Sequence, residues 1–172
     1  LMGAYAGDAL TDADFNVAMG FQALTNDTLG SASTALGHHA LQTQNFSSAT
    51  NSLNTAVGYQ AGKGVTTREK NTFVGAQAGG DSTFTGDSNT LVGYAAGFNL
   101  TSGGNNLFLG KQAGRAGSPS GVQTTGSGTV CLGDDNISDL FCADTSISSS
   151  DSRDKADITD FNIGLNLSII HI

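Results

Sequence analysis

The sequence predicts an all-β fold, a repetitive parallel β-roll or β-solenoid, on the basis of three observations. A short motif recurs about every 17 residues, 24 of the 172 residues are Gly, and charged helix formers are scarce, with a single Glu in the chain. The period is too short for a helical pair or a propeller blade, and it suits one coil of short strands and turns. The composition excludes a helical bundle, and the lack of a Gly at every third residue excludes collagen.

The repeat is centred on a glycine, and its copies share most of their neighbours. Asn54-Thr-Ala-Val-Gly-Tyr-Gln-Ala-Gly62 aligns with Asn71-Thr-Phe-Val-Gly-Ala-Gln-Ala-Gly79 and with Asn89-Thr-Leu-Val-Gly-Tyr-Ala-Ala-Gly97. The eight central glycines are Gly3, Gly20, Gly37, Gly58, Gly75, Gly93, Gly110 and Gly133. Positions in the repeat are counted from this glycine, so that −1 precedes it and +1 follows it.

Positions −1 and −2 are both apolar, which predicts a short strand whose two faces are both covered. Position −1 is Met, Leu or Val in all eight copies, and position −2 ranges from Ala to Phe, with Cys131 in the last copy. Neighbouring side chains of a strand point to opposite faces. One face fills the interior of its own coil. We expect the outward apolar column, including Phe73 and Phe108, to need another chain.

The other positions of the repeat predict turns. Position +3 is Ala in seven of the eight copies, which indicates a contact with no room for a larger side chain. The central Gly offers a positive φ or a close backbone approach, and Asn or Ser at position −4 is typical of turn capping. The segments 42–53, 63–70, 80–88 and 115–128 vary in length and are rich in Ser, Thr, Gly and Asn. We interpret them as solvated turns, and loops of this kind are also candidates for receptor contact.

Charge and composition exclude several classes of partner. The net charge is −8 with 7 Lys+Arg, so no basic patch for nucleic acid or anionic lipid is expected. No apolar run approaches the roughly 18 residues of a membrane span, so no membrane insertion is expected. The chain opens in the middle of a repeat, at Leu1-Met-Gly3, so we expect the natural N-terminus to lie further upstream. Cys131 is expected to be a buried free thiol, with a Cys131–Cys142 bridge as the alternative.

Few residues suggest chemistry, and neither a cofactor nor a metal is predicted. His38-His39 is interpreted as a polar pair at a turn, and strand alternation would let only one of the two face a metal on an assembly axis. Asp134, Asp135 and Asp139 form the only acidic cluster of the repeats, the place where a polysaccharide depolymerase would need paired carboxylates. Thr34, Thr55, Thr72 and Thr90 share position −3. The shared position predicts a threonine ladder, which is a feature of ice-binding solenoids. Val17 and Leu107 occupy the same position in other copies and interrupt the ladder.

The Asn-Thr-Ala-Val-Gly-Tyr-Gln-Ala-Gly motif resembles the head repeats of trimeric autotransporter adhesins and of bacteriophage tail fibres, over about residues 1–136. The resemblance implies a left-handed parallel β-roll and a homotrimer packed around an axis. It also implies attachment to a host-cell receptor, either a glycan or an outer-membrane component, and contact with other tail proteins. The localisation that follows is the tail fibre of a virion, with a bacterial surface adhesin and a tailspike depolymerase as alternatives.

A second resemblance lies beyond a linker at 137–149. Ser150-Asp-Ser-Arg-Asp-Lys155 and Phe161-Asn-Ile-Gly-Leu165 resemble the opening of the endosialidase-type intramolecular chaperone, which drives trimerisation of tail fibres and then cuts itself off. The resemblance makes Ser150 the nucleophile and Lys155 its base, because a serine hydroxyl needs a base to become reactive. Residues 150–172 would be the truncated start of that domain, so self-cleavage is expected only in a full-length protein. No other enzymatic activity is expected.

Overall fold

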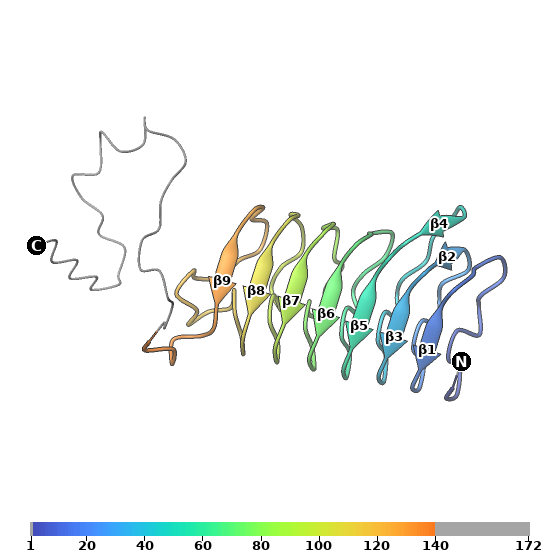
Figure 1. The fold of residues 1–172 in the computed structure, drawn as a ribbon, viewed down its shortest axis with the longest axis horizontal. Coiled ribbons are helices and arrows are strands. Elements are labelled where there is room, and N and C mark those ends of the chain that lie inside the picture. Colours follow the sequence, from blue (N-terminus) through green and yellow to red (C-terminus); the bar gives the residue numbers. More distant parts are fainter. Residues whose placement is uncertain (1, 140–172) are drawn as a thin grey trace, which may run out of the picture. The chain divides into compact units, whose positions relative to one another are not determined.

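The computed structural model describes residues 2–139, and these residues form an all-β parallel solenoid without a helix (Figure 1). One compact unit covers Leu1–Ser138. The seven-stranded parallel sheet runs in the order β1 (Val17–Met19), β3 (Thr34–Leu36), β5 (Thr55–Val57), β6 (Thr72–Val74), β7 (Thr90–Val92), β8 (Leu107–Leu109) and β9 (Val130–Leu132). A second sheet pairs β2 (Gly30–Ser31) with β4 (Thr50–Asn51). The predicted fold class is confirmed. The linker at 137–149 lies mostly outside the described residues, and the segment at 150–172 lies wholly outside them.

The register of the large sheet follows the repeat position by position. Ala56 pairs with Phe73, Phe73 with Leu91, and Leu91 with Phe108, so each position −2 residue lies directly over its equivalent in the next coil. Thr, Val and Leu at positions −3 and −1 fit a pleated, half-buried strand. Each strand is only three residues long because it runs from a capping residue at position −4 to the central glycine.

The central glycines bring successive coils into direct backbone contact. At Gly75 the backbone has a φ of +124°, and an added Cβ would lie 2.5 Å from the carbonyl oxygen of Gly93 in the next coil. The same close approach recurs at Gly58, where a Cβ would lie 2.7 Å from the carbonyl oxygen of Gly75. A side chain at this position would therefore collide with the neighbouring backbone, which explains why only glycine occupies it.

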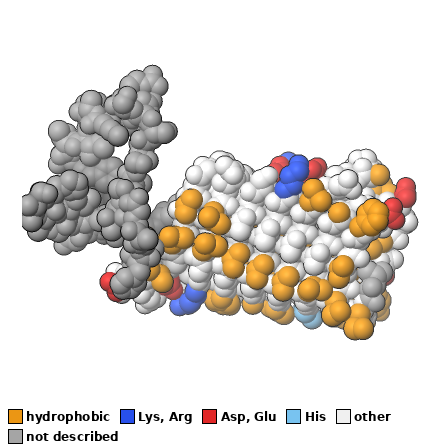
Figure 2. Space-filling model, viewed as in Figure 1, with side chains coloured by type: hydrophobic (Ala, Val, Ile, Leu, Met, Phe, Trp, Pro, Cys, Tyr) orange, Lys and Arg blue, Asp and Glu red, His pale blue; other side chains and the backbone are white. Residues whose placement is uncertain are grey.

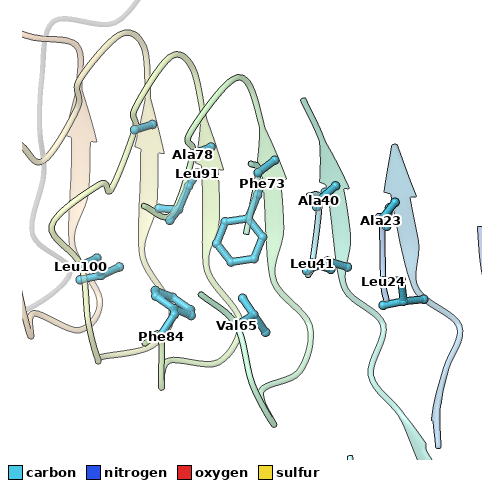
Figure 3. Close-up of a cluster of buried hydrophobic side chains, with 14 of the residues drawn as sticks. Ala23, Leu24, Ala40, Leu41, Val65, Phe73, Ala78, Phe84, Leu91 and Leu100 are labelled. Carbon is cyan, nitrogen blue, oxygen red and sulfur yellow. The ribbon is translucent and has the colours of Figure 1, made fainter. Parts of the chain in front are cut away.

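The interior of the coil is filled by position −2 and by the alanines at position +3. Phe73 and Phe108 are both fully buried inside the coil. The sequence-based expectation that these two side chains point outward was therefore wrong, and the outward column is position −1. Figure 3 shows Phe73 and Leu91 pointing inward from their strands, toward side chains supplied by the returning segments. Among these, the ring of Phe84 packs edge-on against Phe73 with a centroid distance of 5.5 Å.

A ladder of buried asparagines at position −4 runs along the solenoid. The Asn71 carboxamide oxygen accepts hydrogen bonds from the backbone N–H and the side-chain amide of Asn89, at 2.9 and 3.1 Å. Asn89 accepts the equivalent pair from Asn106, at 3.1 and 2.9 Å. The Asn71 amide also donates to the carbonyl of Gly86 at 2.9 Å. Each asparagine therefore ties its own turn to the next coil, a wider role than the turn capping predicted from the sequence.

A second buried polar cluster joins the two coils on either side of Gly37. The Asp27 carboxylate, fully buried, accepts hydrogen bonds from the backbone N–H of Gly30 at 3.0 Å and from the Gln44 side chain at 2.6 Å. Gln44 also donates to the hydroxyl of Ser33 at 2.8 Å. The cluster satisfies polar groups in the part of the coil that carries β2 and β4.

Removing one rung of the asparagine ladder should destabilise the solenoid strongly. Asn71→Ala leaves the buried N–H of Asn89 and the carbonyl of Gly86 without their partners, which should lower the free energy of unfolding by about 3 kcal/mol. Chemical denaturation followed by circular dichroism measures the loss. The exposed Asn26 is the control, and Asn26→Ala should change the stability by less than about 0.5 kcal/mol. Equal stability of the two variants would contradict the role assigned to the ladder.

Candidate functional site

The first candidate surface is the outer face of the seven-stranded sheet, formed by positions −1 and −3. In each strand the central residue is buried and the two flanking residues are partly or fully exposed. Met19, Leu109 and Leu132 at position −1 are 47%, 37% and 40% exposed. Figure 2 shows hydrophobic side chains gathered in rows across the repeats, with few charged side chains among them. The outer face is therefore an apolar strip that a single chain leaves uncovered.

The threonines form the predicted ladder on this outer face. Thr34, Thr55, Thr72 and Thr90 pair in register, strand after strand. Val17 and Val130, at the two ends of the sheet, are 48% and 63% exposed and extend the same column with apolar groups. The threonines are half-buried beside the row of aliphatic side chains at position −1, so the face as a whole offers hydrophobic contact rather than a purely polar ladder.

The second candidate surface is the turn column, defined as position +1: Ala4, Phe21, His38, Tyr59, Ala76, Tyr94, Lys111 and Asp134. Its rings stack along the solenoid. The centroids of Phe21 and His38 lie 5.3 Å apart with planes inclined by 25°, and His38 and Tyr59 lie 5.3 Å apart at 20°. This spacing follows the parallel strands, which lie roughly 4.8 Å apart. The stack was not predicted, although the recurrence of aromatic residues at position +1 was a visible signal.

His38 and His39 lie side by side on this edge, with ring centroids 3.9 Å apart. They belong to a turn, as predicted, and the strand alternation considered for a metal site does not apply there because His39 has a φ of +59°. Both ring nitrogens of His39 are shielded from solvent and have no hydrogen-bond partner among the described residues. Burial lowers the pKa of His39, and the nearby His38 and Lys63 lower it further, so this edge carries a neutral imidazole near pH 7. Within residues 2–139, no group of three or more His, Cys, Asp or Glu side chains could hold a metal ion.

The acidic cluster at the end of the repeats contains an ion pair. Asp134 lies 3.0 Å from the ammonium group of Lys111. The hydrogen bond with Lys111 lowers the pKa of the Asp134 carboxyl, and the backbone N–H of Asn136 acts in the same direction. A carboxylate held ionised in this way is poorly suited to serve as a general acid, which a depolymerase would require.

The returning segments are tied to one another by exposed ion pairs. Lys63 and Asp81 lie 3.8 Å apart, and Arg68 and Asp87 lie 3.5 Å apart, each pair joining two successive coils. Exposed pairs of this kind contribute at most about 1 kcal/mol each. The segments are therefore fixed chiefly by the backbone ladder, and their side chains are presented from a rigid scaffold.

Of the remaining candidate residues from the sequence, Cys131 lies among the described residues and three others lie outside them. Cys131 is a buried free thiol, as predicted, and its sulfur lies 2.9 Å from the hydroxyl of Ser118. Cys142, Ser150 and Lys155 lie outside the described residues, so their roles stay predictions.

Together, the repeats and the uncovered outer face define the described chain as a parallel β-solenoid with an apolar strip along one side. No protein family, curated protein or solved structure matches the sequence or the fold. Among residues 2–139 there is no helix that would be long and apolar enough to cross a membrane.

Proposed function

We propose that this chain is the shaft or head segment of a homotrimeric viral tail fibre that mediates attachment to a host cell. The observation that carries the proposal is the apolar outer face. It continues over all seven strands, and a side chain of Val, Leu or Met that becomes fully covered there contributes roughly 1–2 kcal/mol. A strip repeated over seven strands therefore favours association along its whole length.

A second copy of the same chain is the partner that fits this face best. The strip repeats at every coil, so a partner must present a matching apolar surface with the same spacing, and an identical chain does so by construction. The physics requires more than one chain, and the resemblance of the repeat to adhesin heads and tail fibres selects three. Such an assembly places the three outer faces around an axis and leaves the turns and returning segments outside for a receptor, either a glycan or an outer-membrane component.

The test of this proposal is the mass of the purified chain in solution. Light scattering should give three times the chain mass of 17.4 kDa, and the mass should persist on dilution to low micromolar concentration. A folded monomer in the same measurement would refute the assembly. Binding of the purified trimer to host cells, and its competition with infection, would then test the attachment role.

The self-cleavage predicted at the C-terminal segment is tested in a chain that carries the complete chaperone domain. The wild type should appear as two pieces, cut between Ser150 and Asp151. Ser150→Ala removes the nucleophile and Lys155→Ala removes its base, so either variant should remain one uncut chain that still forms trimers. A denaturing gel with intact mass of the pieces gives the readout. Full cleavage of Ser150→Ala would eliminate the assignment.

A further inference from the structure

The aromatic stack of the turn column is interrupted at one coil. Tyr59 is covered on one side by His38, and the next residue of the column is Ala76, followed by Tyr94. Tyr59 and Tyr94 are each 50% exposed. The methyl group of Ala76 therefore stands where a continuous stack would have a ring.

Between the two tyrosines the column carries only the methyl group of Ala76. The turns on both sides of it are joined coil to coil, because Gln77 N–H donates to the carbonyl of Tyr59 at 2.8 Å and Ala95 N–H donates to that of Ala76 at 2.9 Å. The two tyrosines stand two coils apart, a separation of roughly 10 Å. A flat ring inserted midway would lie roughly 5 Å from each tyrosine, within the range of stacked contacts.

The rim of this space carries amide groups and little charge. Gln60 and Gln77 at position +2 lie beside Tyr59 and Ala76 in the turn, and the Gln77 amide reaches the Gln60 carboxamide oxygen at 3.4 Å. The lowered pKa of His39 leaves that neighbouring imidazole neutral, Lys63 is paired with Asp81, and the ammonium of Lys111 is paired with Asp134. Amides both donate and accept hydrogen bonds, which matches hydroxyl groups better than a phosphate or carboxylate.

We propose that the slot between Tyr59 and Tyr94, with Ala76 as its floor, is a binding site for a neutral pyranose sugar. The two C–H faces of a pyranose ring would contact the tyrosine rings, while its equatorial hydroxyls would reach the amides of Gln60 and Gln77. The inference deepens the proposed attachment function by naming a ligand class and a site. The slot is formed by turns that follow the central glycines, whereas the outer face is formed by strand positions −1 and −3, so the two surfaces can be tested separately.

The test combines a slot-filling variant with a matched control. Ala76→Tyr supplies the missing ring and should abolish binding. Ala4→Tyr adds the same ring to the same position of the repeat, outside the slot, and should bind like the wild type. Tyr94→Ala removes one wall and should weaken binding about tenfold. Saturation-transfer NMR on the full 172-residue chain measures binding, and circular dichroism checks each fold. The probes are the methyl glycosides of glucose, galactose, mannose and N-acetylglucosamine at millimolar concentration, with indole as the aromatic comparison.

The outcomes separate the slot from the assembly. Binding that is lost in Ala76→Tyr and kept in Ala4→Tyr supports the site, even if light scattering finds a monomer and so refutes the fibre. A trimer that shows no saturation transfer to any of the four sugars overturns the site and leaves the fibre standing. Transfer only to indole, or an altered mass of Ala76→Tyr, would also overturn it, because the slot would then take an aromatic side chain of a partner or of a second copy.

Discussion

Gly75→Ala is expected to destabilise the solenoid severely. The added Cβ would lie 2.5 Å from the carbonyl oxygen and 2.7 Å from the carbonyl carbon of Gly93, and both atoms belong to backbone that is held in the inter-coil ladder. The φ of +124° is also one that L-residues rarely adopt. Strain and overpacking together should lower the free energy of unfolding by more than about 4 kcal/mol, against the roughly 5–15 kcal/mol of a typical domain.

The matched control for this variant is Gly121→Ala. Gly121 also has a positive φ, +65°, but an added Cβ there would meet no atom within 4 Å. Gly121→Ala should therefore lower the free energy of unfolding by about 1 kcal/mol, the cost of placing an L-residue at a positive φ. Circular dichroism and thermal unfolding of the two variants measure the difference. A Gly75→Ala protein that unfolds at the wild-type temperature would show that the coils can move apart at the central glycine without a loss of stability.

The strands and their register could be predicted because the repeat determines both. Identical motifs stacked in parallel can pair in only one register without moving position −2 out of the interior, so the copies at Gly58, Gly75 and Gly93 align as their sequences do. The glycine at the centre was also interpretable from its recurrence alone, because close backbone approach is one of the two reasons for a repeated glycine.

The alternation of side chains along a strand could not show which apolar column, position −1 or position −2, fills the interior. It shows only that the two columns lie on opposite faces. A signal for it was present in the sizes of the side chains. At the coils where position −2 is Phe73 or Phe108, position +4 is Gly79 or Gly114, and a Cβ on either glycine would lie 2.5 Å from the phenylalanine ring. Where position −2 is alanine at residues 18 and 35, position +4 is leucine instead. The coil of Ala56 has Gly62 at position +4, and there the neighbouring coils fill the space, because a Cβ on Gly62 would lie 2.7 Å from the Phe73 ring and 3.0 Å from Leu41.

This exchange of large and small residues identifies position −2 as the interior column. An interior of fixed cross-section must keep its filled volume nearly constant, so a large side chain from the strand is matched by the absence of one from the turn. The residues of position −1, by contrast, stay of medium size in every coil, which is what an uncovered face permits. The rule was available from the sequence and would have placed Phe73 and Phe108 correctly.

The aromatic turn column was missed for a different reason. Strand alternation would send the side chains of positions +1 and +2 to opposite sides, but residues at position +2 have a positive φ, +59° at His39 and +56° at Gln60. This turn brings both side chains to the same edge. Four of the seven residues at this position are Gln, which is not a usual left-handed residue, so composition alone did not reveal the turn.

Two lysines on the outer face should dissociate the assembly without unfolding the chain. Val57 and Val92 lie at position −1 of β5 and β7, separated by β6, so Val57→Lys and Val92→Lys together place two charges on the face without pairing them directly. In a single chain, each ammonium can extend from this half-exposed position into water. In a trimer, six ammonium groups would be buried around one axis, at a cost of several kcal/mol per uncompensated charge.

The expected result is a threefold fall in mass by light scattering, to that of one 17.4 kDa chain, with an unchanged circular dichroism spectrum. The control carries the same two added charges at exposed sites outside the strands, Thr83→Lys and Val122→Lys, and should keep the wild-type mass. If both double variants dissociate, net charge alone controls the association. If neither does, the chains associate through another surface, and the outer face is not the interface.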